Sequence, residues 1–407
     1  MPRQPRILFV HDNYPAQFGA FGHWLAGRGW DVTFATAARD ARADGPAVLH
    51  YAPHRPPSRE THPYAQPMDR AALKAQAFAR TALAARRAGY RPDIVMAHSG
   101  WGAGMFAKDI FPEAAFVAYC EWWYRYPGPD VSYLAALGEQ APSPSVEAPM
   151  HERARNAPIA MDLTAADAAL CPTGFQAAQF PPVLRRSLTV LHDGVDTAYF
   201  SPDAHAADPR LDGIAPPGSR LVTYATRGME PHRGFPQFMA ALPAILADPA
   251  VVVVVAGANR VAYGSDAVRR VDWKQRALDG LGPERQRVHF VGHLDRHAYR
   301  ALLRRSDAHV YLTVPFVLSW SMLEAMSCGC NLVLSDTAPV REFANARCSR
   351  LVDMAEPAGI AAGIREALAD TPSARSRRTR ARALIAAATS NAVLYPRKER
   401  WLHDLRR

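Results

Sequence analysis

Short apolar runs alternate with amphipathic stretches along both halves of this 407-residue chain. The apolar runs predict buried strands, and the stretches between them have helical spacing. Five consecutive valines, Val251–Val255, are typical of a strand buried on both faces of a parallel sheet. The predicted strands are Arg6–Val10, Trp30–Thr36, Asp93–Ala97, Ala115–Ala118, Ala168–Cys171, Leu188–Leu191, Leu221–Tyr224, Val251–Ala256, Val288–Val291, His309–Leu312 and Leu332–Leu334.

The alternation of strands and helices predicts an α/β protein with two doubly wound domains. Helices are expected at Gly19–Gly27, near Asp69–Ala88 and near Asn391–Arg407. A Pro-rich segment, Ser201–Ser219, separates the halves and has the composition of a domain boundary. We predict an N-terminal domain at 1–200, a linker at 201–218, a C-terminal domain at 219–385, and a C-terminal helix at 386–407 that packs back on the N-terminal domain.

Bulk composition narrows the class of protein. Hydrophobic residues make up 49% of the chain and charged residues 21%, which is typical of a globular protein, and the length suits two domains. No apolar run is long enough to span a bilayer, and the N-terminus does not read as a secretory signal. The five cysteines are odd in number and lack zinc-ligand spacing, which favours reduced thiols in a cytoplasmic protein.

The formal net charge of +10 raises the question of an acidic partner. The richest basic run is Arg375–Arg382. It could be a solvated helix face, a patch facing acidic lipid at the inner membrane, or a nucleic-acid-binding surface. No helix-turn-helix, RRM or zinc-finger pattern accompanies the charge, so we expect no nucleic-acid partner.

The segment at 311–342 carries the clearest chemical signal. A predicted strand is followed by a short loop and by a helix that opens at 319–324. Free N–H groups at the start of such a helix hold anionic ligands. Ser319 and Ser321 add hydroxyl groups there, and Glu324 adds a carboxylate. Alternatively, Ser321 and Glu324 form a capping box, in which the carboxylate binds the helix N-terminus instead of a ligand.

Two arginines follow the first predicted strand of the second half. Arg227 and Arg233 flank a turn that contains glycine and proline. The planar guanidinium group matches phosphate oxygens and stays charged at any relevant pH, so the pair suits a diphosphate. The alternative is a pair of ordinary surface salt bridges.

The first half offers weaker candidates. The loop at 11–19 has no GxGxxG pattern, which argues against a nicotinamide site. Gly19 would let a phosphate or a sugar approach the start of a helix, or it is a simple turn glycine. His98 precedes a Gly-rich turn and is either a structural donor or a substrate ligand.

Glu121 lies among aromatic residues after another predicted strand. This setting suits a sugar contact or acid/base chemistry. Alternatively, the aromatic residues fill a domain interface and Glu121 pairs with Arg125. We find no Ser/His/Asp triad, no P-loop lysine motif and no carboxylate-rich metal cluster in the sequence.

Taken together, these segments resemble the GT4 family of retaining, nucleotide-sugar-dependent glycosyltransferases with the GT-B fold, over nearly the whole chain. The resemblance is carried by Arg227, Arg233-Gly234, Gly292 after a strand, SWSMLEAMSCGC and SDTAPVRE, and by His192–Asp196 with Phe200–Pro202. The segments VHDNYPAQF, YCEWWYRYP and CPTGFQAAQFP resemble a bacterial subgroup associated with polysaccharide and other glycoconjugate synthesis.

The resemblance implies two Rossmann-like domains facing each other across a ligand-binding cleft. It implies that Arg227 and Arg233 hold the donor diphosphate and that Glu324 binds the donor ribose. Ser319 and Ser321 would lie near the phosphates, Gly19 would face the donor from the other domain, and Glu121 falls at or near the position of a sugar-contacting histidine.

One position departs from the family pattern. Phe316 stands eight residues before Glu324, where the E-x7-E motif has its first glutamate. The carboxylate often placed beside the transferred sugar is therefore missing, although main-chain N–H groups around 316–319 would still bind sugar and phosphates. Catalysis would rest on positioning and on electrostatic stabilisation of the leaving diphosphate.

We therefore expect a cytoplasmic hexosyltransferase, peripheral at the inner membrane, that needs no cofactor and no metal. Its partners would be a UDP- or GDP-sugar donor and a saccharide, lipid-linked or small-molecule acceptor, with loops at 52–67 and 131–150 as acceptor walls. Three alternatives remain: a catalytically inactive sugar-nucleotide-binding partner, which Phe316 favours, a nucleotide-sugar epimerase on the same fold, and a basic membrane-surface scaffold.

Overall fold

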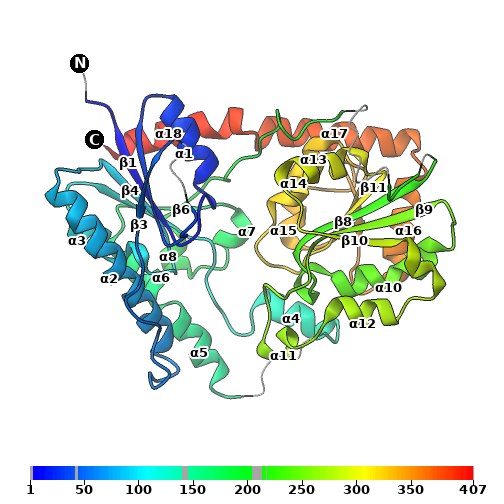
Figure 1. The fold of residues 1–407 in the computed structure, drawn as a ribbon, viewed down its shortest axis with the longest axis horizontal. Helices are drawn as coiled ribbons and strands as arrows, with labels where there is room; N and C mark the ends of the chain where they lie inside the picture. The colour runs from blue at the N-terminus through cyan, green and yellow to red at the C-terminus, as the bar shows by residue number, and fades with distance from the viewer. Residues whose placement is uncertain (1–2, 42–44, 140–144, 204–212, 217, 407) are drawn as a thin grey trace. The chain divides into compact units, whose positions relative to one another are not determined.

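The computed structural model describes residues 3–41, 45–139, 145–203, 213–216 and 218–406. The chain divides into two compact units. Unit 1 comprises Met1–Pro127, Ser143–Gly194 and Ala392–Arg407, and unit 2 comprises Gly128–Pro142 and Val195–Asn391. Each unit is a parallel sheet with helices on both faces, which confirms the predicted α/β class (Figure 1).

The units differ from the predicted domains by about six residues at two boundaries, since 195–200 and 386–391 group with unit 2, and in one longer segment. Residues 128–142 group with unit 2, where α4 (Pro129–Ala136) buries Leu134 in the core. The predicted acceptor loop at 131–150 is therefore partly helical, because α4 and α5 (Ala148–Arg155) occupy its two ends. Residues 140–144 of this loop, and 204–212 and 217 of the predicted linker, lie outside the described residues.

The sheet of unit 1 has the strand order β3-β2-β1-β4-β5-β6-β7, with every neighbouring pair parallel. The sequence did not predict β3, a half-exposed edge strand with only three consecutive apolar residues. The strands are β1 (Arg6–His11), β2 (Asp31–Thr36), β3 (Ala47–His50), β4 (Ile94–His98), β5 (Ala115–Tyr119), β6 (Ala168–Cys171) and β7 (Leu188–Val190).

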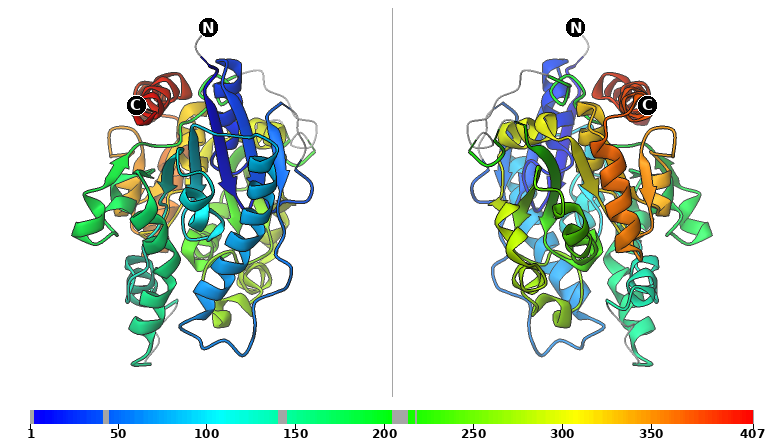
Figure 2. Two further views of the ribbon diagram at one scale, coloured as in Figure 1. Left: turned by 90° about the vertical axis from the view of Figure 1, so that its left-hand side faces the viewer. Right: turned by 90° about the vertical axis from the view of Figure 1, so that its right-hand side faces the viewer.

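Alternate residues of β1 serve the two faces of this sheet. Ile7 and Phe9 pack with α1 (Gly19–Gly27) and α18 (Asn391–Leu405). Leu8 and Val10 pack with α2 (Gln66–Arg87), which runs along the other face (Figure 2). The C-terminal helix is thus part of the core of unit 1.

The sheet of unit 2 has the order β10-β9-β8-β11-β12-β13, again parallel throughout. Helices α10 (Phe235–Leu246) and α16 (Pro357–Leu368) lie side by side on one face (Figure 2). Helices α14 (Trp320–Cys328) and α17 (Pro372–Ala388) cover part of the other. The strands are β8 (Arg220–Gly228), β9 (Val251–Ala258), β10 (Val288–Gly292), β11 (Ala308–Tyr311), β12 (Leu332–Ser335) and β13 (Arg350–Val352).

Each sheet reverses its direction of winding at one point, between β1 and β4 in unit 1 and between β8 and β11 in unit 2. The loops that leave such neighbouring strands run in opposite directions and open a crevice at the carboxyl edge, where α/β proteins bind ligands. The relevant loops begin after His11 and His98 in unit 1, and after Gly228 and Tyr311 in unit 2.

The basic run lies on α17 and is partly neutralised. Arg375 forms an ion pair with Asp370, and Arg377 forms one with Glu366. These pairs favour the solvated-face interpretation of the run. The five cysteines are buried and free. In the part of the chain that the structure describes, no helix combines the length and the apolar character needed to cross a membrane.

Candidate functional site

Arg233 is buried at the carboxyl edge of the unit 2 sheet, with 6% of its surface exposed. Its Nη1 donates to Thr313 Oγ1 at 3.0 Å and to the carbonyl oxygen of Val317 at 3.1 Å. The ring of Tyr263 lies 5.3 Å from the guanidinium carbon. Among the described residues no carboxylate lies within ion-pair distance of Arg233, so neutral groups hold this cation in place.

The charge of Arg233 persists in this setting. Burial acts to lower the pKa of Arg233, but Tyr311, Tyr263 and Glu230 outweigh burial and raise it above its usual value. A buried cation that neutral partners hold in place is suited to an anionic ligand, because no described carboxylate forms an ion pair with it.

Gly234 makes the position of Arg233 possible. Its φ is +65°, and a Cβ there would lie 2.5 Å from the Cβ of Leu312. The left-handed conformation turns the chain from Arg233 directly into α10, and the missing side chain lets this turn pack against the strand end.

Arg227 differs from Arg233 in its surroundings. It is exposed near the end of β8 and makes no hydrogen bond or ion pair with the residues that the structure covers. The alternative of ordinary surface salt bridges is therefore wrong for both arginines. The unit 2 edge thus presents one anchored guanidinium group and one unengaged group.

The start of α14 joins the Arg233 group through Tyr311. The Tyr311 hydroxyl accepts from the Ser319 N–H at 2.9 Å and lies 3.4 Å from Arg233 Nη1. Ser319 is the N-cap of α14, and its Oγ accepts from the Ser321 hydroxyl at 2.9 Å. The structure therefore brings Arg233, Ser319 and Ser321 together at the predicted helix start.

Glu324 does not form the capping box. Because Ser319 is the N-cap, Glu324 is the fifth residue of α14, too far along the helix to bind its N-terminal N–H groups. It lies beside Tyr299 and Arg296 of α13 (Arg296–Arg305). Burial raises the pKa of Glu324 to about 7, although Arg296 and Tyr299 oppose this shift.

Phe316 belongs to an aromatic cluster in the loop between β11 and α14. Its ring lies 5.1 Å from the ring of Tyr263 and 5.9 Å from that of His232. Tyr263 therefore contacts both Phe316 and Arg233, and an aromatic wall stands where the family pattern has a carboxylate.

Glu230 is a residue that sequence reasoning missed. It is fully buried, and its Oε2 accepts from the N–H groups of Tyr263, at 2.9 Å, and Ala262. This carboxylate fixes the loop that carries Tyr263. Its position between Arg227 and Arg233 was the one indication in the sequence that Glu230 has a role at this site.

In unit 1 the structure brings Glu121 and His98 together. Glu121 Oε2 lies 3.5 Å from His98 Nε2, and Gln17 donates to Glu121 Oε1 at 3.0 Å. Burial acts to raise the pKa of Glu121, but His98 and Gln17 lower it overall, so the carboxylate is ionised. The alternative in which Glu121 pairs with Arg125 is wrong, because Arg125 donates to Gln179 instead, at 2.6 Å.

His11 extends this group and was not predicted as a site residue. It ends β1, is buried, and its ring lies 4.8 Å from the ring of His98. Burial, together with His98, lowers the pKa of His11 to about 3, so the imidazole is neutral. Its place at the end of the strand beside the switch point was the available signal.

Gly19 serves internal packing. A Cβ at Gly19 would lie 2.2 Å from the Cβ of Pro15, and the Gly19 N–H donates to the Pro15 carbonyl at 2.8 Å. The space that the glycine leaves open is filled by its own loop. The structure therefore gives Gly19 a packing role, and the approach of a phosphate or sugar to its backbone stays a prediction.

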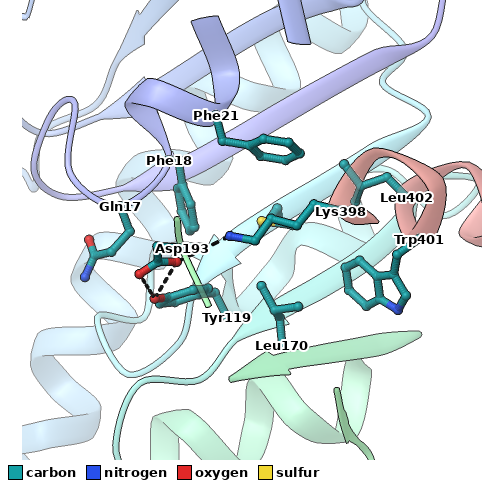
Figure 3. A pocket seen from close by; sticks show the side chains of 10 residues that line it. Gln17, Phe18, Phe21, Tyr119, Leu170, Asp193, Lys398, Trp401 and Leu402 are labelled. Carbon is teal, nitrogen blue, oxygen red and sulfur yellow. Dashed lines mark hydrogen bonds and ion pairs between the residues drawn. The ribbon is translucent and has the colours of Figure 1, made fainter. Parts of the chain in front are cut away.

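A buried ion pair lies deeper in unit 1 (Figure 3). The Tyr119 hydroxyl donates to Asp193 at 2.9 Å, and Lys398 Nζ from α18 lies 3.5 Å from the same carboxylate. The cavity beside them holds about 10 Å³, room for no more than one water. This group therefore ties α18 to the sheet and is too closed to bind a substrate.

Two protein-family models match the two halves of the chain. Residues 28–200 match the family model described as glycosyl transferase family 4 group, and residues 219–370 match the model described as glycosyl transferases group 1. No curated protein sequence matches the chain.

Solved structures extend the comparison over the full length. Sucrose-phosphate synthase from Thermosynechococcus elongatus is 18% identical, with a TM-score of 0.69 and 99% of both chains covered. Anabaena HepE in complex with UDP-glucose is 16% identical, with a TM-score of 0.69, and covers 98% of this chain and 99% of its own. A UDP-forming trehalose-phosphate synthase from Burkholderia xenovorans is 14% identical, with a TM-score of 0.65 and 99% of both chains covered. At these identities the likeness concerns the fold.

Proposed function

We propose, from the premise that this chain belongs to the glycosyltransferases of the GT-B fold, that it transfers a hexose from a nucleotide diphosphate sugar to an acceptor hydroxyl with retention of configuration. One observation carries the proposal. Arg233 and Arg227 present two cations that no described carboxylate neutralises, at the switch point of unit 2 and, for Arg233, next to the start of α14. A diphosphate is the ligand that this charge arrangement suits.

A UDP-sugar is the first donor to test. The HepE structures contain UDP, or UDP-glucose, and the trehalose-phosphate synthase is a UDP-forming enzyme. A GDP-sugar remains the alternative, because nothing in the charge arrangement distinguishes the two bases.

The proposed chemistry places each group in one role. Arg233, Arg227 and the N-terminus of α14 stabilise the charge that builds up on the leaving diphosphate. Glu324 binds the donor ribose, and Glu121 contacts the acceptor. The acceptor hydroxyl attacks from the face that the diphosphate leaves, and the two arginines take the place that a divalent metal has in other transferases.

The test is calorimetric titration of the protein with UDP-glucose, GDP-glucose and GDP-mannose. We expect one of them to bind, and we expect the double variant Arg227→Ala/Arg233→Ala to lose that binding. Arg341→Ala is the matched control, since Arg341 is an arginine of the same unit already paired with Asp336. Binding that survives the double substitution would show that the diphosphate assignment is wrong.

Two further measurements test the finer claims. NMR of the product's anomeric centre should show the configuration of the donor. Transfer in the presence of excess EDTA should proceed at the rate measured without it. An inverted product or a metal requirement would each contradict the proposal.

A second candidate, sugar-nucleotide binding without transfer, is favoured by Phe316. Its ring packs against Tyr263 and His232 where the family pattern has a carboxylate. Donor binding without hydrolysis or transfer across a broad acceptor panel would support this candidate over the transferase.

We also propose a cytoplasmic protein that is peripheral at an acidic membrane. Arg380 on α17 is exposed and makes no ion pair with the residues that the structure covers. Co-sedimentation with vesicles containing phosphatidylglycerol should exceed that with phosphatidylcholine vesicles, and the difference should shrink at high salt.

A further inference from the structure

Trp101 stands at the tip of the turn that follows β4, with 41% of its surface exposed. Gly100 and Gly102 on either side have φ values of +92° and +91°. A Cβ at Gly102 would lie 2.4 Å from the Cα of Ala71 in α2. The turn is therefore packed tightly against the scaffold, so the exposed ring is held in a fixed place at the switch point of unit 1.

The neighbours of Trp101 form a defined polar surface around its ring. Lys74 Nζ lies 4.8 Å from the ring centroid, within cation–π distance. Lys74 also pairs with Asp12, which accepts a hydrogen bond from the Tyr51 hydroxyl at 2.8 Å. The indole N–H of Trp101 makes no hydrogen bond with any residue that the structure describes and remains available as a donor.

His98 connects this aromatic group to Glu121. Its ring lies 5.9 Å from the Trp101 ring, and its Nε2 lies 3.5 Å from Glu121 Oε2. The Glu121 side chain is 30% exposed, so a ligand can reach its carboxylate. An aromatic face, an indole N–H and an ionised carboxylate thus lie around one buried histidine.

The charge of this surface selects among acceptors. The Lys74 cation is paired with Asp12, the His11 imidazole is neutral, and Glu121 is ionised. The lysine of this surface is therefore already paired, and the ionised Glu121 would repel a phosphate. Aromatic faces and carboxylates suit the C–H face and the hydroxyl groups of a neutral sugar.

We propose that this surface is the acceptor subsite and that it takes a neutral saccharide, with the sugar ring stacked on Trp101 and its hydroxyls bound by Glu121. This inference rests on the proposed transferase function and specifies its acceptor. An acceptor recognised at its reacting end through a phosphate group would not fit here.

The experiment is saturation-transfer NMR titration of the intact protein with methyl glycosides of glucose, galactose, mannose and N-acetylglucosamine, and with glucose 6-phosphate. We expect at least one neutral glycoside to bind, and we expect Trp101→Ala to weaken it about tenfold, as truncation of an aromatic anchor does. Trp101→Phe, and Leu83→Ala as a control that removes an exposed apolar side chain from α2, should stay within about twofold of the original affinity.

The outcomes separate this inference from the donor proposal. UDP-glucose titration of Trp101→Ala should match that of the unaltered protein. If the unaltered protein binds no nucleotide sugar, that result counts against the transferase proposal alone. Equal glycoside binding by Trp101→Ala would overturn the acceptor subsite. So would tighter binding of glucose 6-phosphate than of methyl glucoside, or a panel in which no neutral glycoside binds.

Discussion

The two sheet edges have the same topology and opposite chemistry. Both sit at the switch point of a parallel sheet, where the loops after two neighbouring strands diverge. In unit 2 the loops carry one arginine held by neutral groups and one unengaged arginine. In unit 1 they carry a carboxylate, a neutral histidine and an exposed tryptophan. The fold thus decides where a ligand binds, and the charge of a few loop residues decides which ligand it is.

The largest effect on ligand binding should follow from removing the buried cation of unit 2. Arg233→Ala should weaken donor binding about 100-fold, or about 2.7 kcal/mol, because charge-assisted hydrogen bonds to the diphosphate are lost and the oxygens of Thr313 and Val317 lose their donor. Arg227→Ala should cost about tenfold, and less at high salt, since this guanidinium group is exposed. Calorimetry at two salt concentrations measures both.

Equal losses of donor affinity in the two variants would contradict the proposed difference between an anchored and an unengaged arginine. Circular dichroism should accompany the titration, because removal of a buried side chain also lowers stability. Arg233→Lys, which keeps the charge and loses the planar fork, should fall between the alanine variant and the unaltered protein.

The next effect concerns unit 1 and should leave donor affinity alone. Glu121→Gln should lower kcat/KM about 30-fold, within the range for a charged group that contacts the reacting sugars. The dissociation constant for the donor should stay unchanged, because Glu121 belongs to the other sheet edge. Steady-state kinetics combined with calorimetry separates these quantities.

Arg125→Ala is the matched control for Glu121. The structure places Arg125 on Gln179, so its loss should change neither activity nor donor affinity. A change in donor affinity in Glu121→Gln would contradict the proposal that the unit 2 edge binds the donor and the unit 1 edge binds the acceptor.

The core and the cationic half of the site could be predicted from sequence because their signals are local. Val251–Val255 identify a strand buried on both faces, and Arg227 and Arg233 carry their charge and their place after a strand in the sequence itself. The edge strands β3 and β13 were missed because they are short and partly exposed, with no more than three apolar residues in a row.

The rest of the site depends on contacts between distant segments. Nothing near His11 indicates that its ring packs on His98, and nothing near Glu230 indicates that it binds a loop some thirty residues away. The capping box failed for a local reason, because Ser319 caps the helix and competes with Ser321 for that role. The packing of Gly19 against Pro15 could not be predicted, because no sequence pattern marks that contact.

A stability effect should follow from Gly102, which holds Trp101 in place. Gly102→Ala should lower the free energy of unfolding by about 3 kcal/mol, since it combines left-handed strain with a Cβ too close to Ala71. Gly29→Ala is the control: its φ of +89° is similar but its surroundings are open, so the loss should be about 1 kcal/mol. Urea denaturation measures both.

Glu324 should give the smallest effect, one that depends on pH. Burial raises its pKa from 4.5 to about 7, so between these values the folded protein keeps a proton that the unfolded chain has lost. Its contribution to stability is therefore full below pH 4.5 and is lost as the pH rises through 7. Glu324→Gln should flatten this part of the stability profile, which urea denaturation from pH 4 to 8 would measure.

Protonation of Glu324 should also weaken binding of the donor. Ribose hydroxyls donate best to an ionised carboxylate, so donor affinity should rise about threefold from pH 6 to pH 8 and should not rise in Glu324→Gln. Acceptor-glycoside binding at the unit 1 edge should stay constant over this range, because Glu121 has a lowered pKa and is already ionised. A parallel rise in glycoside affinity would mean that the two edges share one titrating group, against the separation that their different chemistry implies.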